Sequence, residues 1–100
     1  MTWGNMGSLK ALDGKRDELL AILARYKPEL ADAGCLVYEV GTNPSTPDRV
    51  YVLEVWDSAE SHRASLGMGS VRNALHEALP LLDGDMVSMK FDIVGSPLTP

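Results

Sequence analysis

The run from Val50 to Trp56, Val-Tyr-Val-Leu-Glu-Val-Trp, contains more architectural information than any other part of the chain. Its β-branched and aromatic residues predict a strand. Apolar side chains occupy both alternating faces of that strand, so both faces of the sheet need cover. We therefore expect a sheet with helices on one face and a second copy of the chain on the other.

The segments on either side of residues 50–56 complete an alternating order of strands and helices. Apolar residues at spacings of three and four predict helices, and shorter alternating runs predict strands. In the first half of the chain we expect a strand at 1–12, a helix from Lys15 to about Lys27, a short turn on to Ala33 and a strand at 35–40, with Tyr26 and Leu30 on the apolar stripe of the helix. In the second half we expect a strand at 50–56, helices at 58–66 and 70–80, a turn at 83–85 and a strand at 86–94. Ser70 is the expected N-cap of the 70–80 helix.

This order defines the expected fold class. A βαββαβ chain is of the α+β class with a ferredoxin-like fold, a four-stranded antiparallel sheet with two helices on one face. Two copies packed sheet to sheet would form a dimeric α+β barrel. We expect one domain at residues 1–95 and a tail at 96–100. The alternative, a monomer with a bare apolar sheet, leaves a patch that is rare on soluble monomers.

Composition and charge exclude several classes of partner. The 100 residues include 14 acidic and 9 basic side chains, which gives a net charge of −5. Nucleic acids and anionic membrane surfaces need a basic footprint, so neither is expected. No apolar run approaches the roughly 20 residues of a membrane span. The single Cys35, read as a small buried hydrophobe, and the absence of a signal-peptide pattern favour the cytoplasm.

Two histidines are the candidate chemical groups, because nucleotide-binding and zinc motifs are absent. On the 58–66 helix, His62 shares a face with Ala59, Ser65 and Leu66, and this face is expected to meet the sheet. On the next helix, the four-residue spacing of Arg72 and His76 places both at the rim of the same space.

Structural alternatives exist for each candidate. His62 could be a core-boundary histidine, and His76 a solvated group on a helix surface. Trp56 could serve only as core packing. Glu39 and Glu54 lie on neighbouring expected strands, where we interpret them as polar groups of the sheet edge or interface, with acid–base work as a lesser role.

The chain resembles the antibiotic biosynthesis monooxygenase family, including the quinol monooxygenases. The resemblance covers about residues 3–95 and depends on short motifs in the right order. They are Asp13-Gly14-Lys15-Arg16, Ala33-Gly34-Cys35-Leu36-Val37-Tyr38, Val52-Leu53-Glu54-Val55-Trp56, a W-x5-H-x2-S-L pattern from Trp56 to Leu66, and Pro80-Leu81-Leu82-Asp83-Gly84.

The resemblance implies a dimer that oxidises hydroquinones or polycyclic phenols with O₂, without flavin, haem or metal. It implies a pocket between sheet and helices, lined by Trp56 and by the second helical region. His62 stands where polyketide-oxidising members have Tyr, and His76 where they have Arg. Those members carry a strand Asn where this chain has Val52, and Asn5 is the candidate replacement amide.

Haem-degrading relatives share the fold but need a different residue set. They carry an Asn on the first strand, a Trp at the position of Ser65 and a His at that of Leu75, one residue before His76. This chain lacks the Trp and the His at those positions. The haem interpretation is therefore disfavoured.

The functional hypothesis is a cofactor-independent monooxygenase. His62 is the expected base, Trp56 the stacking wall, and His76 a third catalytic candidate. Asn5, Ser65, Leu66 and Arg72 are expected to bind the substrate, with Arg72 stabilising an oxyanion. The alternatives are a non-catalytic dimer that binds a small aromatic ligand, and a cofactor-free isomerase or cyclase that needs the same base but no oxygen.

Overall fold

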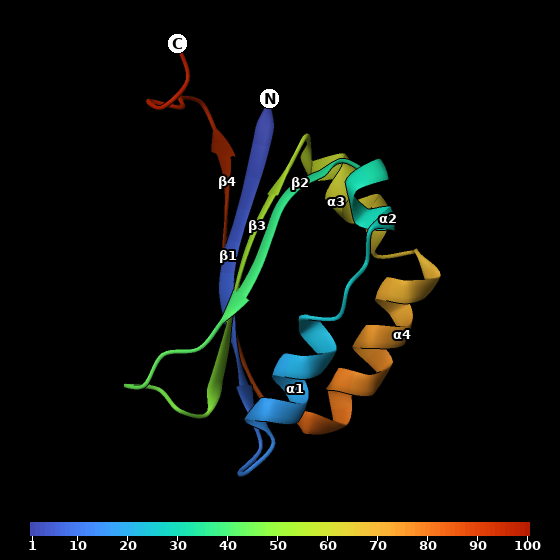
Figure 1. Cartoon of the computed structure of the whole chain (residues 1–100), viewed down its shortest axis with the longest axis vertical. Coiled ribbons are helices and arrows are strands. Elements are labelled where there is room, and N and C mark those ends of the chain that lie inside the picture. Colours follow the sequence, from blue (N-terminus) through green and yellow to red (C-terminus); the bar gives the residue numbers. More distant parts are fainter.

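The computed structural model describes all residues from Met1 to Pro100. The elements, in chain order, are β1 (Thr2–Ala11), α1 (Arg16–Leu23), α2 (Glu29–Asp32), β2 (Cys35–Gly41), β3 (Arg49–Trp56), α3 (Ala59–Ser65), α4 (Gly69–Ala78), a 3₁₀ turn η1 (Leu79–Leu81) and β4 (Leu82–Ile93). Figure 1 shows the four helices on one side of the sheet.

The four strands form one antiparallel sheet in the order β2-β3-β1-β4. The first and third strands lie at the centre, which is the ferredoxin-like arrangement predicted from the sequence. In the register of the two central strands, Trp3 pairs with Trp56 and Asn5 pairs with Glu54. Even-numbered residues of β3 and odd-numbered residues of β1 therefore share one face, which we call the helix-facing side.

The core lies between α1, α4 and the helix-facing side of the sheet. Leu19 and Val50 are fully enclosed, and Ala74 and Ala78 bring α4 close to α1. A second, smaller core of Trp3, Leu30 and Trp56 lies toward the other end of the sheet. It is this second core that supports the polar residues described below.

The first helix is shorter than predicted. It ends at Leu23, four residues before Lys27, where Pro28 disfavours a helical conformation. Tyr26, expected on the apolar stripe, is 86% exposed. Leu30 is buried from the separate short helix α2, which confirms the expected turn before Ala33.

The two later helices follow the prediction closely. The side chain of Ser58 caps α3 by accepting a hydrogen bond of 3.1 Å from the backbone N–H of Ser61. The prediction of Ser70 as the N-cap of α4 is wrong, because Met68 occupies that position and the helix begins at Gly69. Leu66, Gly67 and Met68 join the two helices.

The predicted turn at Asp83-Gly84-Asp85 is instead a bulge within β4, which begins at Leu82. The register with β1 shifts there, since Leu9 pairs with Met86 and Ala11 with Leu82. Gly84 supplies the positive φ of 78° that such an irregularity favours. The sequence thus correctly indicated a turn-like backbone at Gly84, but the strand continues through this position.

The outer face of the sheet is largely apolar and is uncovered in the single chain. Its exposed apolar side chains include Met6, Leu53, Val87, Met89 and Phe91, and the exposed carboxylate of Glu39 lies beside Leu53 on the same face. With Tyr51, several of them line a shallow hollow of about 470 Å³. None of the helices is long and apolar enough to span a membrane.

Candidate functional site

A row of four polar residues crosses the helix-facing side of the sheet. Tyr38 on β2 pairs with Glu54 on β3, Glu54 pairs with Asn5 on β1, and Asn5 pairs with Lys90 on β4. Directly opposite residues on antiparallel strands are close neighbours on one face. We call these four residues the polar row.

Glu54 is the centre of the row and is almost fully buried, with 8% of its surface exposed. Its Oε2 accepts a hydrogen bond of 2.8 Å from Nδ2 of Asn5. Its Oε1 accepts one of 3.2 Å from the indole Nε1 of Trp56. A buried carboxylate is costly unless such donors compensate it. The Oδ1 of Asn5 is buried without a partner, which leaves an acceptor free at the site.

His62 lies over this carboxylate, between the two indoles of the chain. Its ring centroid is 4.7 Å from that of Trp3 in a tilted contact, and 5.5 Å from that of Trp56 in an edge contact. Its Nε2 is 3.9 Å from Oε1 of Glu54. The helix α3 positions this ring, and the prediction that His62 points toward the sheet is confirmed.

Burial and nearby cations set the electrostatics of the site. Burial lowers the pKa of His62, with smaller contributions from Lys90 and Arg63, while Glu54 acts in the opposite direction. Burial, followed by the charge of Glu54, raises the pKa of Tyr38 to about 12. At neutral pH the imidazole is therefore neutral and able to accept a proton, while the phenol remains a hydrogen-bond donor.

The structure brings together three of the seven residues predicted for the site: Asn5, Trp56 and His62. Ser65 is buried, but its hydroxyl donates to the backbone carbonyl of His62 at 2.6 Å, so it fixes the turn that holds the histidine. Leu66 is 45% exposed at the end of α3.

Arg72 and His76 are exposed on α4. No hydrogen bond or ion pair connects either of them with His62 or with the polar row. In the single chain, no direct contact therefore supports the predicted position of Arg72 and His76 at the rim of the site.

Sequence reasoning gave Glu54 too small a role. The interpretation of Glu54 as a polar group of the sheet edge or interface is wrong, because Glu54 is buried on a central strand and points to the helices. Glu39 is exposed on the edge strand β2 and pairs with Leu53 on the outer face. A signal was present in residues 50–56. Strict alternation places Glu54 on the same face as Val50 and Trp56, where a lone carboxylate needs an explanation.

Trp3, Tyr38 and Lys90 were also missed. Each joins the site only through the pairing of strands that are distant in the sequence. No local pattern could have assembled them.

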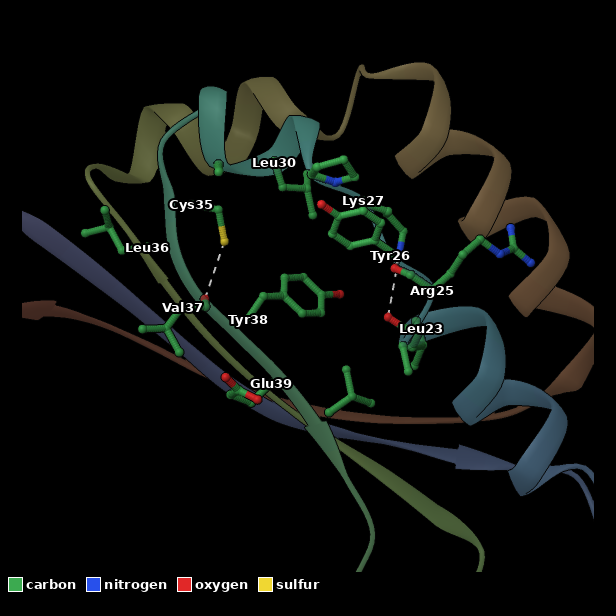
Figure 2. A pocket seen from close by; sticks show the side chains of 14 residues that line it. Leu23, Arg25, Tyr26, Lys27, Leu30, Cys35, Leu36, Val37, Tyr38 and Glu39 are labelled. Atoms are coloured by element: carbon green, nitrogen blue, oxygen red, sulfur yellow. Dashed lines mark hydrogen bonds between the residues drawn. The ribbon is translucent and has the colours of Figure 1, made fainter.

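A cavity of about 420 Å³ lies beside the row, between β2 and the segment that joins α1 to α2. Tyr38 is the only member of the polar row that lines it, and Figure 2 shows its ring pointing into the cavity. Neither Trp56 nor His62 lines this space. Cys35 and Leu30 separate the two regions, because both line the cavity and pack against the core that contains Trp56.

The fold and site define a small ferredoxin-like α+β protein with a buried carboxylate–imidazole pair enclosed by aromatic rings. The family model for antibiotic biosynthesis monooxygenases matches residues 4–77. The chain belongs to the antibiotic biosynthesis monooxygenase family. A search of curated proteins finds no match.

Solved structures agree with this assignment. A protein of Chloroflexus aurantiacus, provisionally named as such a monooxygenase, is 37% identical, with a TM-score of 0.77 over 96% of this chain and 97% of its own. One from Caulobacter crescentus, named in the same provisional way, is 23% identical with a TM-score of 0.78, covering 94% and 91% of the two chains. One from Nitrosomonas europaea is 6% identical with a TM-score of 0.81, covering 90% and 88%. The last two are evidence of the shared fold alone.

Proposed function

We propose that the chain is a cofactor-independent monooxygenase that oxidises a hydroquinone or a polycyclic phenol with O₂. Membership of the family supports a monooxygenase-like role in general. The observation that carries the specific proposal is the pairing of His62 with the buried carboxylate of Glu54 beneath two indole rings.

The chemistry needs a base in an apolar surrounding. Triplet O₂ reacts slowly with closed-shell molecules, but a phenolate can transfer one electron to it, and the radical pair then combines. For an anthrone, one oxygen atom replaces two hydrogens of the ring CH₂ as a carbonyl, and the other oxygen leaves as water. The protein must remove the phenolic proton and hold the ring.

His62 is the proposed base. Its lowered pKa keeps the imidazole neutral at pH 7. Once it takes the substrate proton, the imidazolium faces the carboxylate of Glu54 at close range, which stabilises the charged product of the transfer. The free Oδ1 of Asn5 can accept a substrate hydroxyl, and the Lys90 ammonium can stabilise the phenolate.

The substrate is proposed to approach from the β4 side of the sheet. The helix-facing residues of β4, Met86, Ser88, Lys90 and Asp92, are all exposed, so the helices leave this strand uncovered. The side chain of His62 is 16% exposed. His62 would meet the substrate, with the buried rings of Trp3 and Trp56 packed behind it. Ser65 holds the turn of His62, and the exposed Leu66 at the end of α3 could contact the substrate. Arg72 and His76 stay proposed as rim groups that only a bound substrate would engage.

We further propose that the working form is a homodimer. Members of the family are commonly dimeric. The apolar outer face of this chain is the surface that a second sheet would cover, since Met6, Leu53 and Met89 lie exposed at its centre. Contiguous apolar patches of this kind are typical of interfaces.

The test is O₂ uptake by metal-stripped, flavin-free protein mixed with a panel of hydroquinones and anthrones. Uptake above the uncatalysed rate, lost in His62→Ala and reduced in Trp56→Ala, is the expected result. Glu60→Gln is a matched control, because Glu60 is exposed on the same helix. Full uptake by His62→Ala and His62→Gln at pH 7 would remove the base assignment.

Two other outcomes would replace the proposal. Tight ligand binding with no O₂ uptake would indicate a binding protein of the same fold. Turnover that continues under strictly anaerobic conditions would indicate an isomerase or cyclase that moves only protons.

A further inference from the structure

The cavity beside β2 is a second feature that the proposed reaction does not use. It lies on the far side of Tyr38 from Glu54 and His62, and ten of its fourteen lining residues are hydrophobic. A volume of about 420 Å³ is within the range of small-ligand sites, about 300–1,000 Å³. Such a space needs an occupant with an apolar body.

Two donors at the cavity lack an acidic partner. The hydroxyl of Tyr38 makes no hydrogen bond within the chain, although most of this side chain is enclosed. The Nζ of Lys27 donates to the carbonyl of Arg25 at 3.0 Å and to that of Leu23 at 3.4 Å. An ammonium group has three donors, so one remains for a ligand. Figure 2 shows the ring of Tyr38 pointing into the cavity from β2, with Lys27 on the segment opposite.

The other charged groups at the cavity do not neutralise Lys27. Arg25 is fully engaged, because both of its terminal nitrogens bind the carboxylate of Glu77 at 2.7 and 3.0 Å. Glu39 is exposed at the rim and belongs to the outer face of the sheet. Partial burial, followed by the charge of Arg25, lowers the pKa of Lys27, although Glu29 acts in the opposite direction. An anion hydrogen-bonded to the ammonium group would therefore relieve an existing electrostatic cost.

An aromatic side chain stands at the opening. Tyr26 lines the cavity yet is 86% exposed, which is unusual for a side chain of its size. A flat ring bound in the cavity would cover part of this exposed side chain.

We propose that this cavity binds a small aromatic carboxylate, with the ring among Leu30, Val40 and Tyr26 and the carboxylate held by Lys27 and the Tyr38 hydroxyl. The site is separate from the reaction centre proposed at His62. Its occupancy does not depend on whether the chain is an oxygenase.

The test is isothermal titration of the whole chain with two matched probes, naphthalene-2-carboxylate and naphthalene-2-carboxamide. The carboxylate should bind at least about tenfold more tightly, because a charge-assisted hydrogen bond is stronger than a neutral one. Lys27→Met should abolish this preference, and Tyr38→Phe should weaken carboxylate binding about fivefold. Lys15→Met, which removes an exposed lysine outside the cavity, should change nothing.

Three results would overturn the proposal. They are equal affinity for the two probes, unchanged carboxylate binding in Lys27→Met, or no binding at millimolar concentrations. The same titration in His62→Ala should match the wild type, because His62 does not line the cavity. Loss of binding in that variant, with its melting temperature retained, would mean that the cavity and the reaction centre are one site.

Discussion

The Nε2 atom of His62 lies 3.9 Å from the Oε1 atom of Glu54. This separation is too long for a hydrogen bond, yet short enough for a strong charge interaction once the ring is protonated. The neutral imidazole is therefore held by Trp3 and Trp56 rather than by the carboxylate. Once Nε2 is protonated, the imidazolium would be stabilised by the carboxylate of Glu54, which makes no hydrogen bond with the neutral ring.

Stability should depend on pH through His62. The folded-state pKa of this group is below its ordinary value of 6.5, so its contribution is fully present above pH 6.5 and is lost as pH falls through the folded pKa. Urea unfolding at pH 7.5 and pH 5 should show a larger loss for the wild type than for His62→Gln. Equal losses in the two proteins would contradict this.

The pH dependence of turnover should also be set by the protonation of His62. If His62 is the base, kcat/KM falls on the acidic side with a midpoint below 6.5, the ordinary pKa of histidine. Removing the cation of Lys90, which contributes to this lowering, should move the midpoint upward. The check is a pH–rate profile of the wild type and Lys90→Met, and an unmoved midpoint would exclude this electrostatic link.

Glu54→Gln should cost both stability and activity. The amide offers one acceptor oxygen instead of two, so one of the donors from Asn5 and Trp56 loses its partner. We expect a loss of about 1–3 kcal/mol in the free energy of unfolding. Activity should fall further, because no negative charge remains to face a protonated His62. Glu60→Gln serves as the control in both measurements. If Glu54→Gln were as stable as the wild type, the buried hydrogen-bond network would be refuted.

Two substitutions of Trp56 should separate its packing role from its hydrogen bond. Trp56→Ala empties a site that is 1% exposed and should cost about 3–5 kcal/mol. Trp56→Phe retains much of the ring but loses the donor to Glu54, so it should cost less than half of that. Denaturant unfolding of both variants is the measurement, and equal costs would mean that the hydrogen bond dominates.

The oligomeric state should depend on which face of β4 is changed. Met89→Glu places a charge on the apolar outer face and should convert a dimer into a monomer. Ser88→Glu, one residue away, points to the other side of the sheet and should leave the dimer intact. Sedimentation equilibrium distinguishes the two masses. Dissociation by both variants, or by neither, would argue against packing through this face.

The sequence was sufficient to predict the fold because each element carried its own local signal. The apolar residues of 50–56 and the apolar spacings of the helices at 58–66 and 70–80 required no tertiary information. The errors at Tyr26 and Ser70 concern helix ends, whereas one other error arose where long-range pairing overrides local preference. Asp83-Gly84-Asp85 has turn-forming residues, yet pairing with β1 continues the strand through them as a bulge.

The site was predicted less completely for the same reason. His62 could be proposed from its position on the helix, and Trp56 and Asn5 from the resemblance to the family. The polar row exists only because four strands align Tyr38, Glu54, Asn5 and Lys90 in one register. Nothing near Lys90 in the chain indicates that it faces Asn5.

The contact of His62 with Trp3 and Trp56 has a spectroscopic consequence. These are the two tryptophans of the chain, and both rings lie against the same imidazole. Intrinsic indole emission therefore arises from a single location, and a protonated imidazole is an efficient quencher of excited indole. The protein carries a native optical reporter, whose brightness follows the charge on one side chain without any added label.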